Sequence, residues 1–213
     1  MSIQNMLPKM TSDYKVRNSV LGISGSPRKG GNSDTLLQAV LKGAEEGGSD
    51  TNTALLRDLS ISPCIGCERC RKDKICTGLI DGMTSVYPLI ISSKALVLVS
   101  PTHHYNITAW MKAFIDRLYC FYDFETPRPG PWSSRLDGQN RKAVIVGICE
   151  QENEEDMGFT MDAMAKPLID LGYNITARFP VFSTFTKAGV NKNSAILRKA
   201  HEIGRSLSEQ IRA

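Results

Sequence analysis

The feature that most constrains this chain is a regular alternation of short apolar segments with amphipathic helical patterns. The apolar segments are residues 20–24, 53–59, 95–100, 143–149 and 174–182. Helical patterns with one apolar face follow them, and a long proline- and glycine-rich stretch interrupts the series. This alternation predicts an α/β fold, a three-layer sandwich in which helices cover both faces of a five-stranded parallel sheet.

The bulk properties are those of one ordinary globular domain. The chain has 213 residues, 41% of them hydrophobic and 23% charged, and a formal net charge of +4. This charge does not suggest a nucleic-acid binder, and no apolar stretch reaches the length of a membrane span. We predict a polar arm over residues 1–18 and one domain over residues 19–213. The sequence opens without a long apolar segment, so we expect free thiols and a cytoplasmic location.

Four of the six cysteines fall within thirteen residues, in a C-x2-C-x2-C-x5-C run: Cys64, Cys67, Cys70 and Cys76. Compact ferredoxin runs bind a 4Fe–4S cluster through four thiolates at almost this spacing. Structural zinc, redox thiols or disulfides, and four unrelated thiols are the alternatives. Zinc sites more often use two well-separated C-x2-C pairs, and this is not a short, cysteine-dense secreted chain. The run therefore favours a cluster, in a loop over residues 61–80.

A Gly/Ser-rich segment, residues 25–33, directly follows the first predicted strand and precedes a helix that Asn32 or Ser33 could cap. Backbone N–H groups and the helix dipole favour an anion at such a place. The polar side chains available to that anion are Ser24, Ser26, Ser33 and Arg28. The segment has no Walker A ending and no clear G-x-G-x-x-G, so it favours a monophosphate such as that of FMN. A plain turn is the alternative.

The loop after the third predicted strand, residues 101–106, carries polar and aromatic side chains. In a sheet of order 2-1-3-4-5 it lies beside the Gly/Ser-rich segment, at the switch point of a flavodoxin-like sheet. His103, His104 and Tyr105 could flank a flat ring there, although a single histidine is more often an ordinary surface or core residue.

These motifs resemble those of the iron–sulfur flavoproteins, a branch of the flavodoxin-like NADPH-dependent FMN reductase family. The matching pieces are Gly25-Ser-Pro-Arg-x-x-x-Asn32-Ser33, the cysteine run, Ser100-Pro-Thr, and Met111-Lys-x-x-x-Asp116-Arg117. The resemblance covers about residues 20–212, and the cysteine run is its most specific part.

The resemblance implies two sets of FMN-binding residues. The phosphate would be held by Ser24, Ser26, Arg28, Asn32 and Ser33. The flavin ring would be bordered by Pro101, Thr102, His103, Tyr105 and Asn106. The resemblance also implies one FMN and one 4Fe–4S cluster per subunit of a homodimer or homotetramer, in which the cluster of one subunit can lie near the flavin of another.

We therefore expect a redox enzyme that moves electrons between a donor, a 4Fe–4S cluster and FMN, without an acid–base dyad. Ferredoxin or NAD(P)H would be the donor and a small molecule the acceptor; neither nucleic acid nor membrane is expected as a partner. One alternative is an NAD(P)H-dependent FMN or quinone reductase without a cluster. The other is a non-catalytic redox sensor that binds flavin or metal.

Overall fold

The computed structural model describes residues 15–212, and its centre is one parallel sheet. The five strands are β1 (Arg17–Ser24), β2 (Asp50–Leu55), β3 (Ser93–Pro101), β6 (Lys142–Ile148) and β7 (Asn174–Val181). They pair in parallel in the order β2-β1-β3-β6-β7. This is the expected order 2-1-3-4-5, so the predicted flavodoxin-like α/β fold is confirmed.

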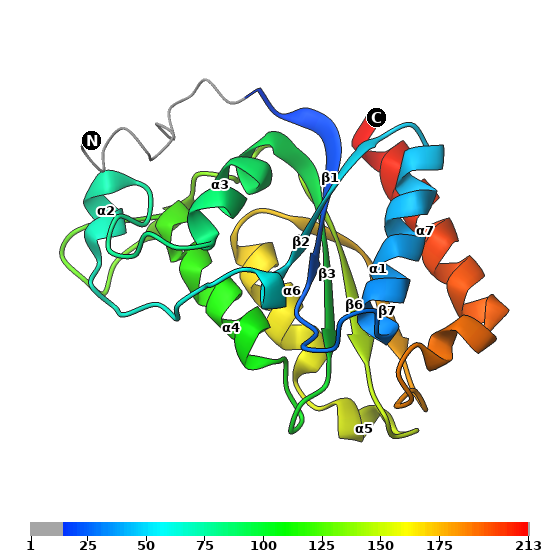
Figure 1. Cartoon of the computed structure of the whole chain (residues 1–213). Helices are drawn as coiled ribbons and strands as arrows, with labels where there is room; N and C mark the ends of the chain where they lie inside the picture. The colour runs from blue at the N-terminus through cyan, green and yellow to red at the C-terminus, as the bar shows by residue number, and fades with distance from the viewer. Residues whose placement is uncertain (1–14, 213) are drawn as a thin grey trace.

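Helices cover both faces of this sheet (Figure 1). The pair α1 (Asn32–Glu46) and α7 (Ser194–Arg212) packs on one face. The other face carries α3 (Met83–Ser92), α4 (Ala109–Asp116) and α6 (Thr160–Asp170). Successive side chains of a strand point to opposite faces, so Leu96 and Leu98 of β3 join one core while Val97 and Val99 join the other. Burial on both faces explains why the central strands read as continuous apolar runs.

Several boundaries differ from the prediction. β1 begins at Arg17 and so takes in the last two residues of the predicted arm, whose residues 1–14 lie outside the described part. β2 ends earlier than expected, and a 3-10 helix, η2 (Leu56–Asp58), follows it. Between β6 and β7 the chain forms two helices, α5 (Glu154–Met157) and α6, which are separated at Gly158, where φ is +53°.

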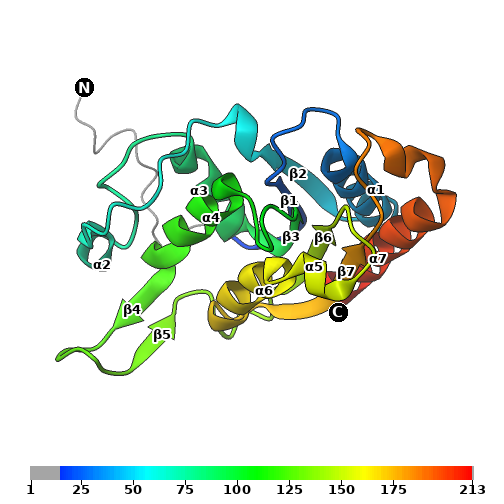
Figure 2. The same cartoon turned by 90° about the horizontal axis from the view of Figure 1, so that it is seen from below.

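The proline- and glycine-rich stretch leaves the sheet as a long excursion, and it contains a short strand that was not predicted. After α4 comes a 3-10 helix, η3 (Arg117–Phe121), and then β4 (Tyr122–Phe124) pairs antiparallel with β5 (Trp132–Ser134). This hairpin projects from the body of the molecule (Figure 2). Tyr122 meets Trp132 edge-on, with ring centroids 5.3 Å apart. Within residues 15–212, no helix is both long and apolar enough to cross a bilayer.

Candidate functional site

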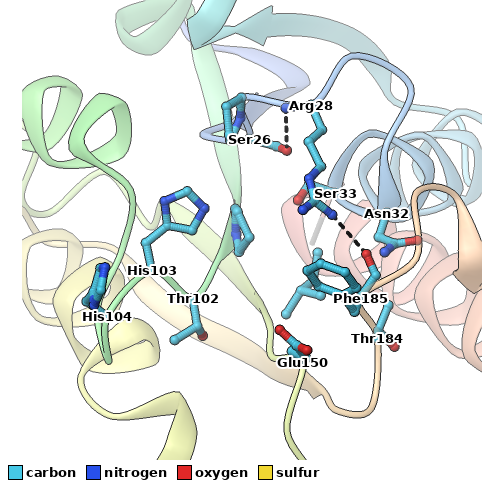
Figure 3. A pocket seen from close by; sticks show the side chains of 13 residues that line it. Ser26, Arg28, Asn32, Ser33, Thr102, His103, His104, Glu150, Thr184 and Phe185 are labelled. Carbon is cyan, nitrogen blue, oxygen red and sulfur yellow. Dashed lines mark hydrogen bonds between the residues drawn. The ribbon is translucent and has the colours of Figure 1, made fainter.

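A cavity of about 400 Å³ opens at the carboxyl edge of the sheet (Figure 3). Its walls come from the segments that follow β1, β3, β6 and β7, which is where open α/β sheets bind ligands. The lining residues are Ser26, Pro27, Arg28, Asn32, Ser33, Pro101, Thr102, His103, His104, Ile148, Glu150, Thr184 and Phe185.

Most of the residues predicted to bind FMN line this cavity, and three of them do not. Ser24 is fully buried behind it, where its hydroxyl donates a hydrogen bond to Asp34 Oδ1 at 3.0 Å. Tyr105 and Asn106 lie on the outer turn of their loop, in which His103 pairs with Asn106 and the Tyr105 side chain is exposed. Their roles in flavin binding stay predictions.

The N-terminus of α1 meets this cavity. The expectation that Asn32 or Ser33 caps the helix is wrong, because Gly31 occupies the capping position and α1 begins at Asn32. First-turn N–H groups of a helix have no partner within it, and the helix dipole adds partial positive charge at that end. The side chain of Ser33 lines the cavity beside them. This end of α1 therefore fits a phosphate group.

Asn32 joins two walls of the cavity. Its Nδ2 donates to the carbonyl oxygen of Thr186 at 2.9 Å, and its Oδ1 accepts from the N–H of Val190 at 3.1 Å. Val190 belongs to a 3-10 helix, η4 (Gly189–Lys192), in the segment between β7 and α7. The side-chain amide thus fixes this segment over the start of α1.

Arg28 crosses the cavity to the same segment. Its Nη1 donates to the carbonyl oxygen of Phe185 at 2.9 Å, and its guanidinium carbon lies 4.8 Å from the centroid of the Phe185 ring (Figure 3). This stacking keeps a positive charge in the cavity wall. Burial lowers the pKa of His103, and the charges of Arg28 and His104 lower it further, so the imidazole is neutral near pH 7.

An ion pair that sequence reasoning missed lies behind the Gly/Ser-rich segment. Arg57 Nη2 is 2.8 Å from Asp34 Oδ2, and both side chains are largely buried. Arg57 also donates to the carbonyl oxygen of Ser26 at 3.3 Å, while Asp34 accepts from the N–H of Gly30 at 2.8 Å. The pair neutralises a carboxylate in the first turn of α1 and fixes the backbone of this segment at two points.

The walls that follow β6 and β7 were also missed. They contribute Ile148, Glu150, Thr184 and Phe185. The rule that ligands bind at the carboxyl edge of the sheet was the signal that could have found them, because each residue lies at or just beyond the end of a predicted strand. Glu150 places a carboxylate opposite Arg28 in this cavity (Figure 3).

A second cavity, of about 340 Å³, lies in the loop after β2. All four cysteines of the run line it, together with Ile65, Gly66, Glu68, Leu79, Asp116 and Tyr119. A short helix, α2 (Arg69–Asp73), carries Cys70, and Glu68 and Lys74 turn the chain at its two ends with φ values of 52° and 58°. All six cysteines, which lie in the described part of the chain, are free thiols.

The space beside Cys67 depends on Gly78. A Cβ atom at Gly78 would lie 2.6 Å from Cys67 Sγ, so any larger residue would force this thiol to move. Four thiols around one cavity fit a group that takes four thiolates. The four thiols do not meet at one point, however. Residues 15–212 contain no cluster of three or more His, Cys, Asp or Glu side chains placed to hold a metal ion. Burial raises the pKa of Cys70, and the other three cysteines add to this shift.

Comparison with known proteins decides the family. The family model for NADPH-dependent FMN reductases matches residues 18–139, more than half of the chain. The chain belongs to this family. Membership supports FMN as the cofactor and confirms the resemblance inferred from the motifs.

Curated relatives of the chain are named iron-sulfur flavoproteins. One, from Archaeoglobus fulgidus, is 39% identical over 159 residues, which cover 73% of this chain and 66% of that protein. Another, from Methanocaldococcus jannaschii, is 34% identical over 136 residues, which cover 64% of this chain and 65% of that protein. The chain therefore spans slightly less than two thirds of the length of each.

The fold of the chain is also found among solved structures. A flavodoxin from the domain Archaea superposes with a TM-score of 0.54, covering 92% of this chain and 99% of that one. The two share 12% sequence identity, so this likeness concerns the fold alone.

Proposed function

We propose that the chain is an FMN-dependent oxidoreductase that moves electrons between a donor, a 4Fe–4S cluster and FMN. The observation that carries this proposal is the presence of two separate cavities in one chain. One lies at the start of α1, and the other is lined by four thiols. Family membership supports the flavin, and the names of the relatives support the cluster.

When bound, FMN exchanges two electrons and an iron–sulfur cluster one at a time, so the pair links one-electron with two-electron chemistry. The residues of this chain bind and orient these groups. We assign the phosphate to the first-turn N–H groups of α1, to Ser26 and Ser33, and to the charge of Arg28. Ser24 and Asn32 act behind them, by holding the segments that form the cavity.

We assign the flavin ring to the loop after β3. Pro101, Thr102 and His103 border it from the cavity wall, and Tyr105 and Asn106 shape the outer turn of this loop. The hydroxyl of Thr160 at the start of α6 donates to Thr102 Oγ1 at 3.0 Å and so orients this side chain. The neutral imidazole of His103 adds no charge beside the ring.

The four cysteines, Cys64, Cys67, Cys70 and Cys76, would supply the cluster ligands. We propose ferredoxin or NAD(P)H as donor, a small-molecule acceptor, a cytoplasmic location suited to free thiols, and a homodimer or homotetramer.

The charges of two segments suit an assembly of several copies. The cysteine loop is net basic, because Arg69, Arg71, Lys72 and Lys74 outnumber Glu68 and Asp73. The segment after β6 is acidic, with Glu150, Glu152, Glu154, Glu155 and Asp156. Contact between these two segments of neighbouring copies would bring cluster and flavin together.

Cys67→Ser tests the cluster in anaerobically purified protein. The wild type should show flavin bands and a broad visible absorption, with iron and sulfide on analysis. The variant should lose iron and sulfide but keep FMN, because the flavin cavity is formed by other segments. Full iron content in the variant would contradict the ligand assignment. Flavin without iron in the wild type would identify a plain reductase, and zinc without flavin would identify a metal-binding module.

A further inference from the structure

The cysteine loop is closed at its base by its own backbone. The N–H of Gly82 donates to the carbonyl oxygen of Ser60 at 2.8 Å. Two residues further in, the N–H of Ser62 donates to Asp81 Oδ2 at 2.9 Å. The chain entering the loop and the chain leaving it therefore lie side by side, and we call residues 60–62 and 79–82 the neck of the loop.

Arg117, from the end of α4, seals this neck. Its Nη1 lies 2.7 Å from Asp81 Oδ2 and 2.9 Å from the carbonyl oxygen of Ser62, to both of which it donates. Its Nη2 donates to Asp81 Oδ1 at 3.2 Å and to the carbonyl oxygen of Leu79 at 3.4 Å. One guanidinium thus bonds both sides of the neck.

The environment of this guanidinium makes the contact specific. The Arg117 side chain is 1% exposed and that of Asp81 is 11% exposed. The Nε of Arg117 is buried without a hydrogen-bond partner in the described part of the chain. Burying a charged group is unfavourable unless its partners are well placed, and removal of one member of a buried pair leaves the other unpaired. A buried arginine at this position is therefore unfavourable unless its hydrogen bonds to both sides of the neck are made.

The opposite end of α4 is fixed to the flavin cavity. Thr108 caps the helix by accepting from the N–H of Met111 at 3.2 Å, and its hydroxyl donates to the carbonyl oxygen of Gly25 at 2.7 Å. Gly25 begins the Gly/Ser-rich segment. At the other end, the Tyr87 hydroxyl donates to the carbonyl oxygen of Arg117 at 3.0 Å. One helix thus joins the segment beside the phosphate site to the base of the cysteine loop.

We propose that Arg117 is a positioning residue for the cysteine site, which it places relative to the flavin cavity by bonding both sides of the neck from the end of α4. The inference rests on the proposed function in so far as the four thiols hold the cluster. Arg117 does not itself line the cysteine cavity. It acts through the loop backbone, which carries all four thiols.

The test compares Arg117→Lys with the wild type in the full chain as purified with its cofactors. Lysine keeps the charge but cannot bond both sides of the neck through one planar group. Amide hydrogen exchange over residues 62–81 should become faster by about tenfold or more, while exchange in the central strands stays unchanged. The absorption and paramagnetic spectra of the bound iron should change as well. The matched control is Arg178→Lys, because Arg178 pairs with Asp162 at 2.8 Å on the exposed surface; it should change neither measurement.

Unchanged exchange over residues 62–81 together with unchanged iron spectra would overturn the proposal. Faster exchange throughout the sheet would also overturn it, because Arg117 would then support the whole fold. If Arg117→Lys fails to fold, Asp81→Asn keeps the size of the side chain and removes the charge, and the same local increase is expected. Hydrogen exchange in the neck can be measured without bound iron. A chain that binds no cluster would therefore contradict the proposed function, while the exchange measurement would still test the role of Arg117.

Discussion

Asn32 joins two walls of the cavity at the start of α1. Both polar atoms of its amide are bonded to the segment after β7. Asn32→Asp keeps the size but replaces the Nδ2 donor with an oxygen that faces the carbonyl oxygen of Thr186. We expect a loss of roughly 1–3 kcal/mol in the free energy of unfolding, measured with urea. We also expect weaker FMN binding, because a carboxylate then lies beside the proposed phosphate site.

Asn193→Asp is the matched control for this substitution. Asn193 Oδ1 accepts from the N–H of Ile196 at the start of α7, and aspartate fills that role equally well. Its unfolding free energy and FMN affinity should stay near the wild-type values. Equal losses of unfolding free energy in the two variants would show that the added negative charge, and not the missing Nδ2 donor, destabilises the fold.

Gly78 controls the space available to one thiol. Alanine at this position would place its Cβ 2.6 Å from Cys67 Sγ, so Gly78→Ala should displace the thiol and lower the iron content per chain while FMN content is kept. Iron, sulfide and flavin analysis of the purified protein measures this. Gly189→Ala is the control, because its new Cβ would meet the nearest atom, Thr186 Cβ, at an ordinary 3.4 Å. Iron content equal to that of the wild type in Gly78→Ala would contradict the expectation.

At the scale of elements, the long and strongly patterned ones could be predicted from the sequence. Continuous apolar runs identified the central strands β3 and β6. The hairpin of β4 and β5 was missed because its strands have three residues each and depend on aromatic packing rather than on alternation. Periodicity does not reveal strands that short.

Among the site residues, local motifs predicted what lies within one segment. Ser26, Ser33 and the four cysteines belong to compact motifs, so the sequence placed each set in a common cavity. The pair of Asp34 and Arg57 could not be found in this way, since the two residues come from different elements and meet only in the folded chain. The same holds for Arg117 and Asp81.

The neck of the cysteine loop should respond to acid. Burial raises the pKa of Asp81, but hydrogen bonds from Arg117 and from the N–H of Ser62 outweigh this and hold it below its usual range. A carboxyl with a lowered folded-state pKa binds fewer protons than in the unfolded chain, so it stabilises the fold above its ordinary pKa of about 4. This contribution is lost as the pH falls through the lowered value.

The difference in unfolding free energy between wild type and Asp81→Asn should therefore be constant from about pH 7 to about pH 5 and shrink below about pH 4. Urea unfolding at a series of pH values measures it. A difference that does not depend on pH would mean that the charge of Asp81 contributes nothing to the neck.

At the scale of the whole molecule, the two cavities lie at opposite ends of α4. Asp116, the last residue of the helix, lines the cysteine cavity, while Thr108 at its start contacts the Gly/Ser-rich segment. If electrons pass across a subunit contact, mixed oligomers of Cys67→Ser and a variant that does not bind FMN should recover electron transfer that neither parent shows. Sedimentation should find no stable monomer at micromolar concentration. A monomer whose flavin is fully reduced through its own cluster would contradict this expectation.

Because α4 is held at both ends, its length fixes both the distance between its two ends and their relative rotation about the helix axis. Each added residue would advance the helix by about 1.5 Å and turn it by about 100°, so Thr108 and Arg117 could no longer both meet their partners. One alanine inserted between Lys112 and Ala113 should abolish binding of FMN or of iron. The same insertion between Gly138 and Gln139, in an exposed turn that lines neither cavity, should leave both unchanged. A chain of this design is free to change length in such a turn but not in the helix between its two sites.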